Sequence, residues 1–239
     1  MDAILHKANT RGHAAHGWLE SWHSFSFGNY HDPTRMHFGA LRVLNDDTVA
    51  PAAGFGQHGH ENMEIISIPL QGDLEHQDSM GNRQVIKQGD VQVMSAGSGI
   101  THSEKNKNSD AFVKFLQIWI IPNEQNVPPR YAQQSFTDAE RHNKLLTIVS
   151  PMGYAEGVNI YQNAWFALGK LDKGVSVNYN LHDSKNGTYT FVLEGDVSVN
   201  EFALNRRDGL GLLKADSLQI TADTNAEVLI MEVPLLGEK

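Results

Sequence analysis

Short runs of β-forming residues, interrupted by turns, are the feature that most limits the folds open to this chain. In the first half HFGALRVLN, MEIISIPLQG, VQVMSAG and AFVKFLQIWIIP follow one another, at about the 8–12-residue spacing typical of a sandwich or barrel. Glycines in the segments between them, at 78–82 and 95–99, allow the positive φ that tight turns need. Helical periodicity is nearly absent, so the pattern predicts an antiparallel β-barrel.

The composition changes between residues 122 and 146, where polar residues surround a tandem proline. Such a stretch indicates a linker. Thr137 precedes Asp138, Ala139 and Glu140 and is placed to act as the N-cap of a short helix.

A second series of β-like runs follows the linker and resembles the first. The segments PLQGDLEHQ (69–77) and VLEGDVSVN (192–200) occupy comparable places in the two series, which we interpret as a degenerate internal repeat. We therefore predict two β domains, residues 1–130 and 131–239, with the short helix between them.

A formal net charge of −9 and the absence of cysteine exclude several kinds of function. The acidic balance gives no electrostatic reason for direct contact with nucleic acid, whose phosphates require clustered Lys and Arg. Without cysteine there is no disulfide framework or thiolate metal site, so histidine and carboxylate must hold any metal. No segment is long and apolar enough to span a membrane, and the N-terminus lacks a signal-peptide layout, so we expect a cytoplasmic protein.

Two pairs of potential metal ligands stand out in the first half. His58 and His60 are one residue apart, and His102 and Glu104 are again one residue apart. In a β-strand the side chains at i and i+2 project from the same face, so each pair would point into the same space. Three imidazoles and one carboxylate suit a divalent transition metal with coordination positions left open for a substrate or dioxygen.

Several blocks of this sequence resemble known motifs. The order Gly54, His58-x-His60, Glu64, Gly72, and then Gly89, His102 and Asn106 is similar to the two cupin motifs. More specifically, GWLESWHSFSFGNYHDPTRMHFGALRVLNDD, GFGQHGHENMEI, GDLEHQDSMGN and GDVQVMSAGSGITHSEKN closely resemble the pirin family, and its bacterial members above all. The resemblance is dense from about residue 11 to 122 and looser in the second half.

The resemblance implies a bicupin of two antiparallel β-sandwich barrels of the jelly-roll type. It implies one metal site, in the N-terminal domain, with His58, His60, His102 and Glu104 as ligands, and a C-terminal cupin domain that has lost its own site. We expect one divalent transition metal, with Fe(II) favoured and Zn, Mn, Ni, Cu or Co as alternatives.

The general cupin pattern offers Glu64 as the carboxylate in place of Glu104. Glu64 shares parity with His60, but four extended residues separate the two by roughly 13 Å, so that only a bend would bring it to the metal. We therefore favour Glu104. Glu64 is then expected to accept a hydrogen bond from a ligand imidazole.

The remaining histidines have plainer interpretations. His76 is expected to be a hydrogen-bonded strand residue rather than a further ligand. His23, His31 and His37 lie in an aromatic block that indicates packing and turn structure before substrate contact. His182 is the one histidine near the place of a first cupin motif in the second half, and we expect it at a turn or on the surface.

The resemblance suggests a quercetin 2,3-dioxygenase-like enzyme that uses dioxygen to cleave the heterocycle of a flavonol, or of another enolic aromatic, with release of carbon monoxide. Glu104 would be a ligand, or the base that takes the proton of the substrate hydroxyl, or both. Two alternatives stay open. One is a non-enzymatic redox sensor or transcriptional co-regulator whose iron controls binding to a protein partner; the other is a metal-binding storage or stress protein.

Overall fold

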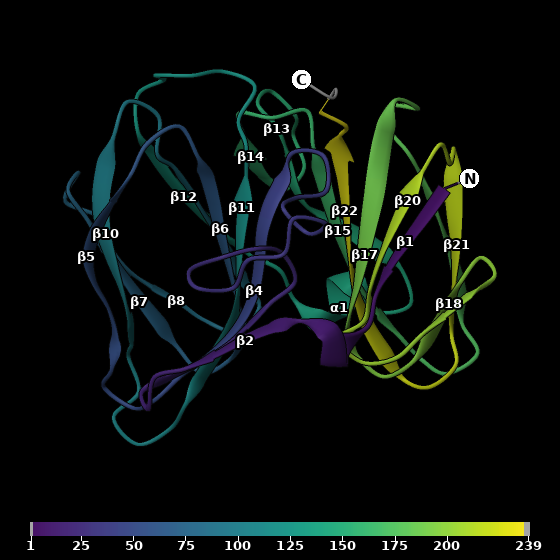
Figure 1. The fold of residues 1–239 in the computed structure, drawn as a ribbon, viewed down its shortest axis with the longest axis horizontal. Coiled ribbons are helices and arrows are strands. Elements are labelled where there is room, and N and C mark those ends of the chain that lie inside the picture. The colour runs from purple at the N-terminus through teal and green to yellow at the C-terminus, as the bar shows by residue number, and fades with distance from the viewer. Residues whose placement is uncertain (1, 237–239) are drawn as a thin grey trace.

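Two β-sandwich barrels lie side by side and make up the molecule (Figure 1). The structure is a computed structural model that describes residues 2–236. The all-β, two-barrel architecture predicted from the spacing of the β-like runs is confirmed. No helix within the described residues has the length and apolar character needed to cross a membrane.

Each barrel combines one large and one small sheet. The large sheet of the first barrel has the spatial order β12 (Arg130–Ser135), β9 (Asp90–Ser95), β6 (Glu64–Gln71), β11 (Val113–Ile120), β4 (Leu41–Val49), β3 (Leu19–His23) and β2 (Gly12–Ala15). Its small sheet has the order β5 (Gly54–His60), β10 (Ile100–Asn106), β7 (Leu74–Asp78) and β8 (Arg83–Ile86).

The second barrel repeats this plan. Its large sheet has the order β1 (Asp2–His6), β20 (Gly209–Leu213), β17 (Asn186–Glu194), β22 (Ala226–Pro234), β15 (Trp165–Leu171), β13 (Leu145–Pro151) and β14 (Val158–Ile160). Its small sheet has the order β16 (Ser176–Asn180), β21 (Ser217–Ala222), β18 (Val197–Val199) and β19 (Phe202–Leu204).

The two strand orders correspond except at one edge of the large sheets, where β2 pairs antiparallel with β3 but β14 pairs parallel with β13. This agreement supports the internal repeat. The repeated Gly-Asp segments supply the same turn in both barrels, between β6 and β7 and between β17 and β18. Gly72 and Gly195 have φ of 73° and 76° there, a left-handed conformation that costs glycine little and other residues more.

The barrels exchange one strand each at matching edges. β12 follows the first barrel in sequence and pairs with its β9, whereas β1, at the start of the chain, pairs with β20 of the second barrel. If the chain is divided between residues 130 and 131, the N-terminal part contributes β1 to the second barrel and the C-terminal part contributes β12 to the first. Because these strands cover backbone groups that would otherwise form an open edge, the exchange ties the two barrels together.

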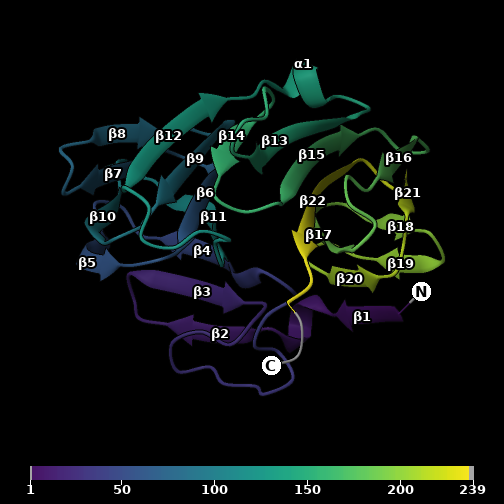
Figure 2. The ribbon, with the colours of Figure 1, turned by 90° about the horizontal axis from the view of Figure 1, so that it is seen from above.

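The largest apolar core lies between the barrels, where the two large sheets pack against each other (Figure 2). Alternate residues of β6 and β11, such as Ile66 and Ile118, contribute from one side, and Tyr189 and Phe191 of β17 contribute from the other. The residues between them on the same strands face the opposite way, into the interior of each barrel. In the second barrel the inner residues form one continuous apolar cluster, but in the first they form two small clusters.

The predicted linker helix is confirmed as α1 (Asp138–Arg141). Thr137 is its N-cap and forms a capping box with Glu140, in which each side chain bonds the other residue's backbone N–H. A single 3-10 turn, η1 (Ala8–Thr10), links β1 to β2.

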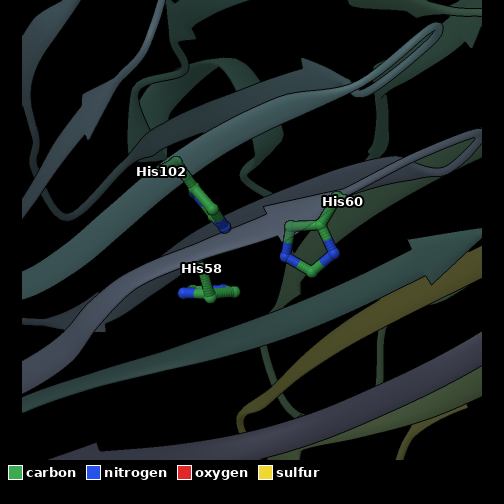
Figure 3. Close-up of side chains that lie close together, drawn as sticks. All are labelled: His58, His60 and His102. Carbon is green, nitrogen blue, oxygen red and sulfur yellow. The ribbon is translucent and has the colours of Figure 1, made fainter.

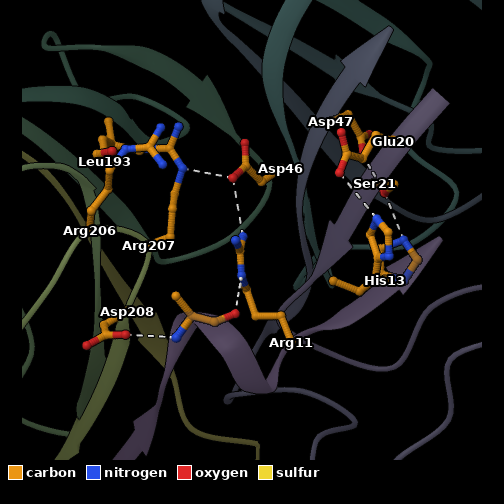
Figure 4. A network of polar contacts seen from close by, with 12 residues as sticks. Arg11, His13, Glu20, Ser21, Asp46, Asp47, Leu193, Arg206, Arg207 and Asp208 are labelled. Atoms are coloured by element: carbon orange, nitrogen blue, oxygen red, sulfur yellow. Dashed lines mark hydrogen bonds and ion pairs between the residues drawn. The ribbon is translucent and has the colours of Figure 1, made fainter. Parts of the chain in front are cut away.

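A buried ionic network joins the N-terminal segment to both barrels (Figure 4). Asp46 on β4 accepts hydrogen bonds from Arg11 at 3.3 Å and from Arg207 at 2.8 Å. Arg207 lies in the second barrel and also donates to the backbone carbonyl of Leu193. Both guanidinium side chains are less than a tenth exposed. Asp46 compensates both cations, and Glu194 lies 3.7 Å from Arg207 as a second, more exposed carboxylate.

Candidate metal centre

A row of polar side chains crosses the inner face of the first barrel's large sheet and separates its two apolar clusters. The members are direct cross-strand neighbours, one from each of six strands: His23, Asn45, Gln117, Ser67, Gln92 and Gln133. Buried polar residues are costly unless they are paired. A polar row at one level of a barrel interior therefore marks a place built for chemistry or binding.

Three of the sequence-predicted site residues meet opposite this sheet. His58 and His60 on β5 and His102 on β10 each bring one ring nitrogen within 4.8 Å of the other two (Figure 3). The ring centroids are 4.5–5.0 Å apart. This proximity follows from strand pairing. His102 lies directly across from His58, and His60, two residues further along β5, lies across from Ile100. His60 and His102 are therefore diagonal neighbours on the same face of the sheet. Among residues 2–236 this is the group of side chains whose geometry can hold a metal ion.

The surroundings of His102 fit a metal. Its Nε2 atom is buried and has no hydrogen-bond partner, while Nδ1 lies 3.4 Å from Nδ1 of His76. Nε2 of His76 is 3.1 Å from the carboxylate of Asp78, which can only accept while ionised. This arrangement leaves Nδ1 of His76 to accept from His102 and directs a free lone pair of His102 Nε2 at the site.

The protonation state of the histidines favours ligation as well. Burial, followed by the charges of His58 and His60, lowers the pKa of His102 to about 2. Burial, followed by the charge of His58, lowers the pKa of His60 to about 4. Metals bind neutral imidazole, so no proton has to be displaced from these two rings at neutral pH.

Asp78 is held as an anion although it is buried. Burial opposes its ionisation, but hydrogen bonds from Asn82 and His76 together keep its pKa below the ordinary value. His76 is thus a hydrogen-bonded strand residue, as predicted from the sequence. The role of Asp78 was not predicted, although Asp78 stands two residues after His76 on β7 and strand parity could have identified it.

Glu104 lies beside the three histidines but outside the group of mutually close ligand atoms. Its carboxylate is buried and accepts hydrogen bonds from Ser67 at 2.8 Å and from Gln117 at 2.5 Å. Burial raises its pKa, and the bond from Ser67 offsets part of that effect. The pairing of β10 with β5 shifts register between His102 and Glu104, so the simple i, i+2 argument does not by itself place this carboxylate on a metal.

Glu64 does not have the expected role. It starts β6 and accepts a hydrogen bond from Ser95 at 2.8 Å, and burial raises its pKa to about 7 against opposing bonds from Ser95 and the backbone of Tyr161. The prediction that it bonds a ligand imidazole is therefore wrong. Its neighbour Ile65 occupies the inner face with Met94, so Glu64 faces away from the histidines.

A cavity of about 400 Å³ opens beside the histidines, a size typical of small-molecule sites. Trp119, Phe27 and Phe55 contribute apolar walls, and Glu104 lines the cavity too. His23, predicted to serve packing, also faces it. The signal for these wall residues was weak, since each is a single residue in a run of ordinary strand composition.

The second barrel is built differently at the matching strands. β21 corresponds to β10 by strand order, and its inner residues Leu218 and Ile220 belong to the apolar cluster that fills this barrel. His182 lies in the bend after β16, as predicted, where it stacks on Trp165 and bonds Glu232 at 2.9 Å.

Comparison with known proteins gives a consistent result. Residues 5–120 match the family model Pirin, and residues 147–233 match the model Quercetinase C-terminal cupin domain. The quercetin 2,3-dioxygenase of Escherichia coli K12 is 41% identical over 96% of this chain and 98% of its own length. A pirin-like protein of Caulobacter vibrioides is 40% identical over 92% of this chain and 95% of its own.

Solved structures agree with the fold. The bacterial pirin YhhW of Escherichia coli, solved in complex with nickel(II), has a TM-score of 0.93 and 39% identity, covering 98% of this chain and all of that one. A second structure of YhhW has the same TM-score and identity. The likeness extends over both barrels, and the chain belongs to the pirin family.

Proposed function

We propose that this protein is a metal-dependent dioxygenase that opens the heterocycle of a flavonol such as quercetin and releases carbon monoxide. The observation that carries the proposal is the unpaired, buried Nε2 of His102 beside His58 and His60 at the edge of an aromatic-lined cavity. Relatives named quercetin 2,3-dioxygenase support the reaction class, and the nickel(II) complex of YhhW supports a metal.

His58, His60 and His102 would hold the metal, with Glu104 as a fourth ligand or as a base. A bound divalent transition metal would act as a Lewis acid toward the substrate's hydroxyl and carbonyl oxygens and supply the redox chemistry that dioxygen requires. Fe(II) remains our preferred metal, and Ni, Mn, Cu, Zn and Co are the others to test.

Glu104 is positioned to accept the proton of the substrate hydroxyl. Burial raises the pKa of its carboxylate, which makes it a stronger base than an exposed glutamate. Gln117 and Ser67 hold its two oxygens, so the acceptor is fixed before the substrate arrives. The walls formed by Trp119 and Phe27 would exclude water from an electron-rich flavonolate.

Anaerobic reconstitution with each candidate metal, followed by oxygen-dependent turnover of quercetin, tests the proposal. We expect Glu104→Gln to lower kcat by about 100-fold or more, as for loss of a general base. Glu64→Gln is the matched control, because it changes a buried carboxyl outside the cavity. If Glu104→Gln keeps full activity and Glu64→Gln loses it, the carboxylate that acts in the reaction is Glu64 and not Glu104.

The same experiment tests the redox-sensor alternative. If no metal supports turnover while the Fe(II) and Fe(III) forms differ in binding to a protein partner, the redox-sensor function replaces the enzymatic one.

Asp78→Asn is expected to weaken metal binding by about 10–100-fold, the usual effect of changing a residue that orients a ligand histidine. The amide can present an N–H where the carboxylate accepted, which disturbs the chain from Asp78 through His76 to His102. A competition titration of Ni(II) against a chelator measures the change. Asp110→Asn, at an exposed position, is the control; equal affinities in the two variants would contradict the orienting role.

A further inference from the structure

A second group of polar side chains lines the cavity on the strands β3 and β4. Nδ1 of His23 and Oδ1 of Asn45 are buried and have no hydrogen-bond partner. Asp47 is 3% exposed, and Ser21 bonds only its Oδ1 atom; within residues 2–236 no protein group bonds Oδ2. Unsatisfied buried polar atoms are costly, so two such atoms on neighbouring strands, beside a carboxylate oxygen that no protein group bonds, indicate a ligand in this cavity.

Ser21 determines which hydrogen-bonding role His23 presents. The Ser21 hydroxyl has one proton and donates it to Asp47 (Figure 4). The hydroxyl oxygen lies 2.8 Å from Nε2 of His23 and must then accept from it. Burial lowers the pKa of His23 to about 4, so the ring is neutral and Nδ1 carries a lone pair. His23, Asn45 and Asp47 therefore all present acceptors.

A surface of acceptors selects a ligand that donates hydrogen bonds. The cavity wall contains no Lys or Arg side chain among the described residues, so no permanently charged side chain beside these acceptors can neutralise a carboxylate or phosphate. Burial, assisted by the nearby Glu104 and opposed by the hydrogen bond from Ser21, raises the pKa of Asp47 to about 7. A phenolic hydroxyl that donates to Asp47 would supply the bond that this carboxylate lacks.

A continuous line of aromatic rings connects the three histidines of the candidate metal centre with His23. His60 contacts Trp119 at a centroid distance of 5.0 Å, Trp119 contacts Phe27 at 5.4 Å, and Phe27 contacts His23 at 5.3 Å. All four line the cavity. A flat aromatic molecule bound at His60 would therefore extend along apolar rings and end at the acceptors.

We propose that His23, Asn45 and Asp47 form a second subsite, which binds the hydroxyl groups on the ring of the substrate farthest from the metal. Ser21 is a positioning residue that acts through His23 and Asp47. This inference rests on the proposed function for the site at the other end of the cavity. It assigns the substrate class as an extended, uncharged polyphenol with hydroxyl donors on its distal ring.

The test measures binding rather than turnover. Nickel-loaded protein is titrated without oxygen with quercetin and with the otherwise identical flavonol that lacks hydroxyls on the pendant phenyl ring. We expect the wild type to bind quercetin about tenfold more tightly, since a hydrogen bond to a charged group is worth about that factor. Asp47→Asn and His23→Phe should each remove most of this preference and change the affinity for the second flavonol by less than about twofold.

His31→Phe, the same substitution at an exposed position, should keep the wild-type preference. Equal affinities of the wild type for the two flavonols would overturn the subsite, and so would a variant that loses both ligands equally. Asp47→Asn keeps the side-chain shape and decides the matter if His23→Phe fails to fold. If the protein prefers quercetin to the second flavonol but does not turn quercetin over, the proposed reaction is refuted and the subsite is not. If it turns quercetin over but binds the two flavonols equally, the subsite alone is refuted.

Discussion

Replacement of His60 by alanine is expected to lower the affinity for a divalent metal by more than about 100-fold and to abolish turnover of quercetin. Changing a residue that only orients a ligand already costs about 10–100-fold, and loss of one of three imidazoles removes a bond outright. The two remaining histidines sit on different strands, so neither can move to fill the gap without breaking strand pairing.

Metal content after dialysis and oxygen uptake with quercetin measure this effect. His31→Ala serves as the control, because it removes an exposed imidazole outside the cavity. The circular dichroism spectrum should stay unchanged in both variants, since His60 is only partly buried. A His60→Ala protein that retains one metal ion and turns quercetin over would contradict the proposed site.

Asp46→Ala is expected to lower the free energy of unfolding by about 3–5 kcal/mol, the cost of leaving a buried charge uncompensated. Asp46 is the carboxylate between Arg11 and Arg207, and each arginine comes from a different part of the chain. Without Asp46 the two guanidinium groups repel each other where β1, the first barrel and the second barrel meet.

Urea denaturation measures this loss, and the slope of the transition shows whether the barrels still unfold together. Arg206→Ala breaks the exposed pair with Glu194 and should change stability by less than about 1 kcal/mol. A similar small change in Asp46→Ala would show that the network does not fasten the barrels.

Much of this fold could be predicted because its signals are local. The spacing of β-like runs predicted the barrels, and Thr137 predicted the linker helix. Strand parity brought together His58, His60 and His102, since residues two apart on a strand face the same side whatever the rest of the fold does.

The remaining features depend on contacts between distant parts of the chain. Nothing within DAILH (2–6) indicates that this strand pairs with β20 rather than with the first barrel. The parity argument for Glu104 did not foresee the register shift after His102, which only strand pairing determines. The proposed subsite of His23 and Asp47 was missed because each looks like an ordinary polar strand residue until the strands are assembled.

Carbon monoxide measured in a sealed, oxygenated reaction decides whether this cavity cleaves flavonols. Metal-loaded wild type should release carbon monoxide from quercetin in proportion to the dioxygen consumed, and His60→Ala treated in the same way should release none. Wild-type protein that binds the metal and quercetin yet releases no carbon monoxide with any of the candidate metals would contradict the proposed reaction.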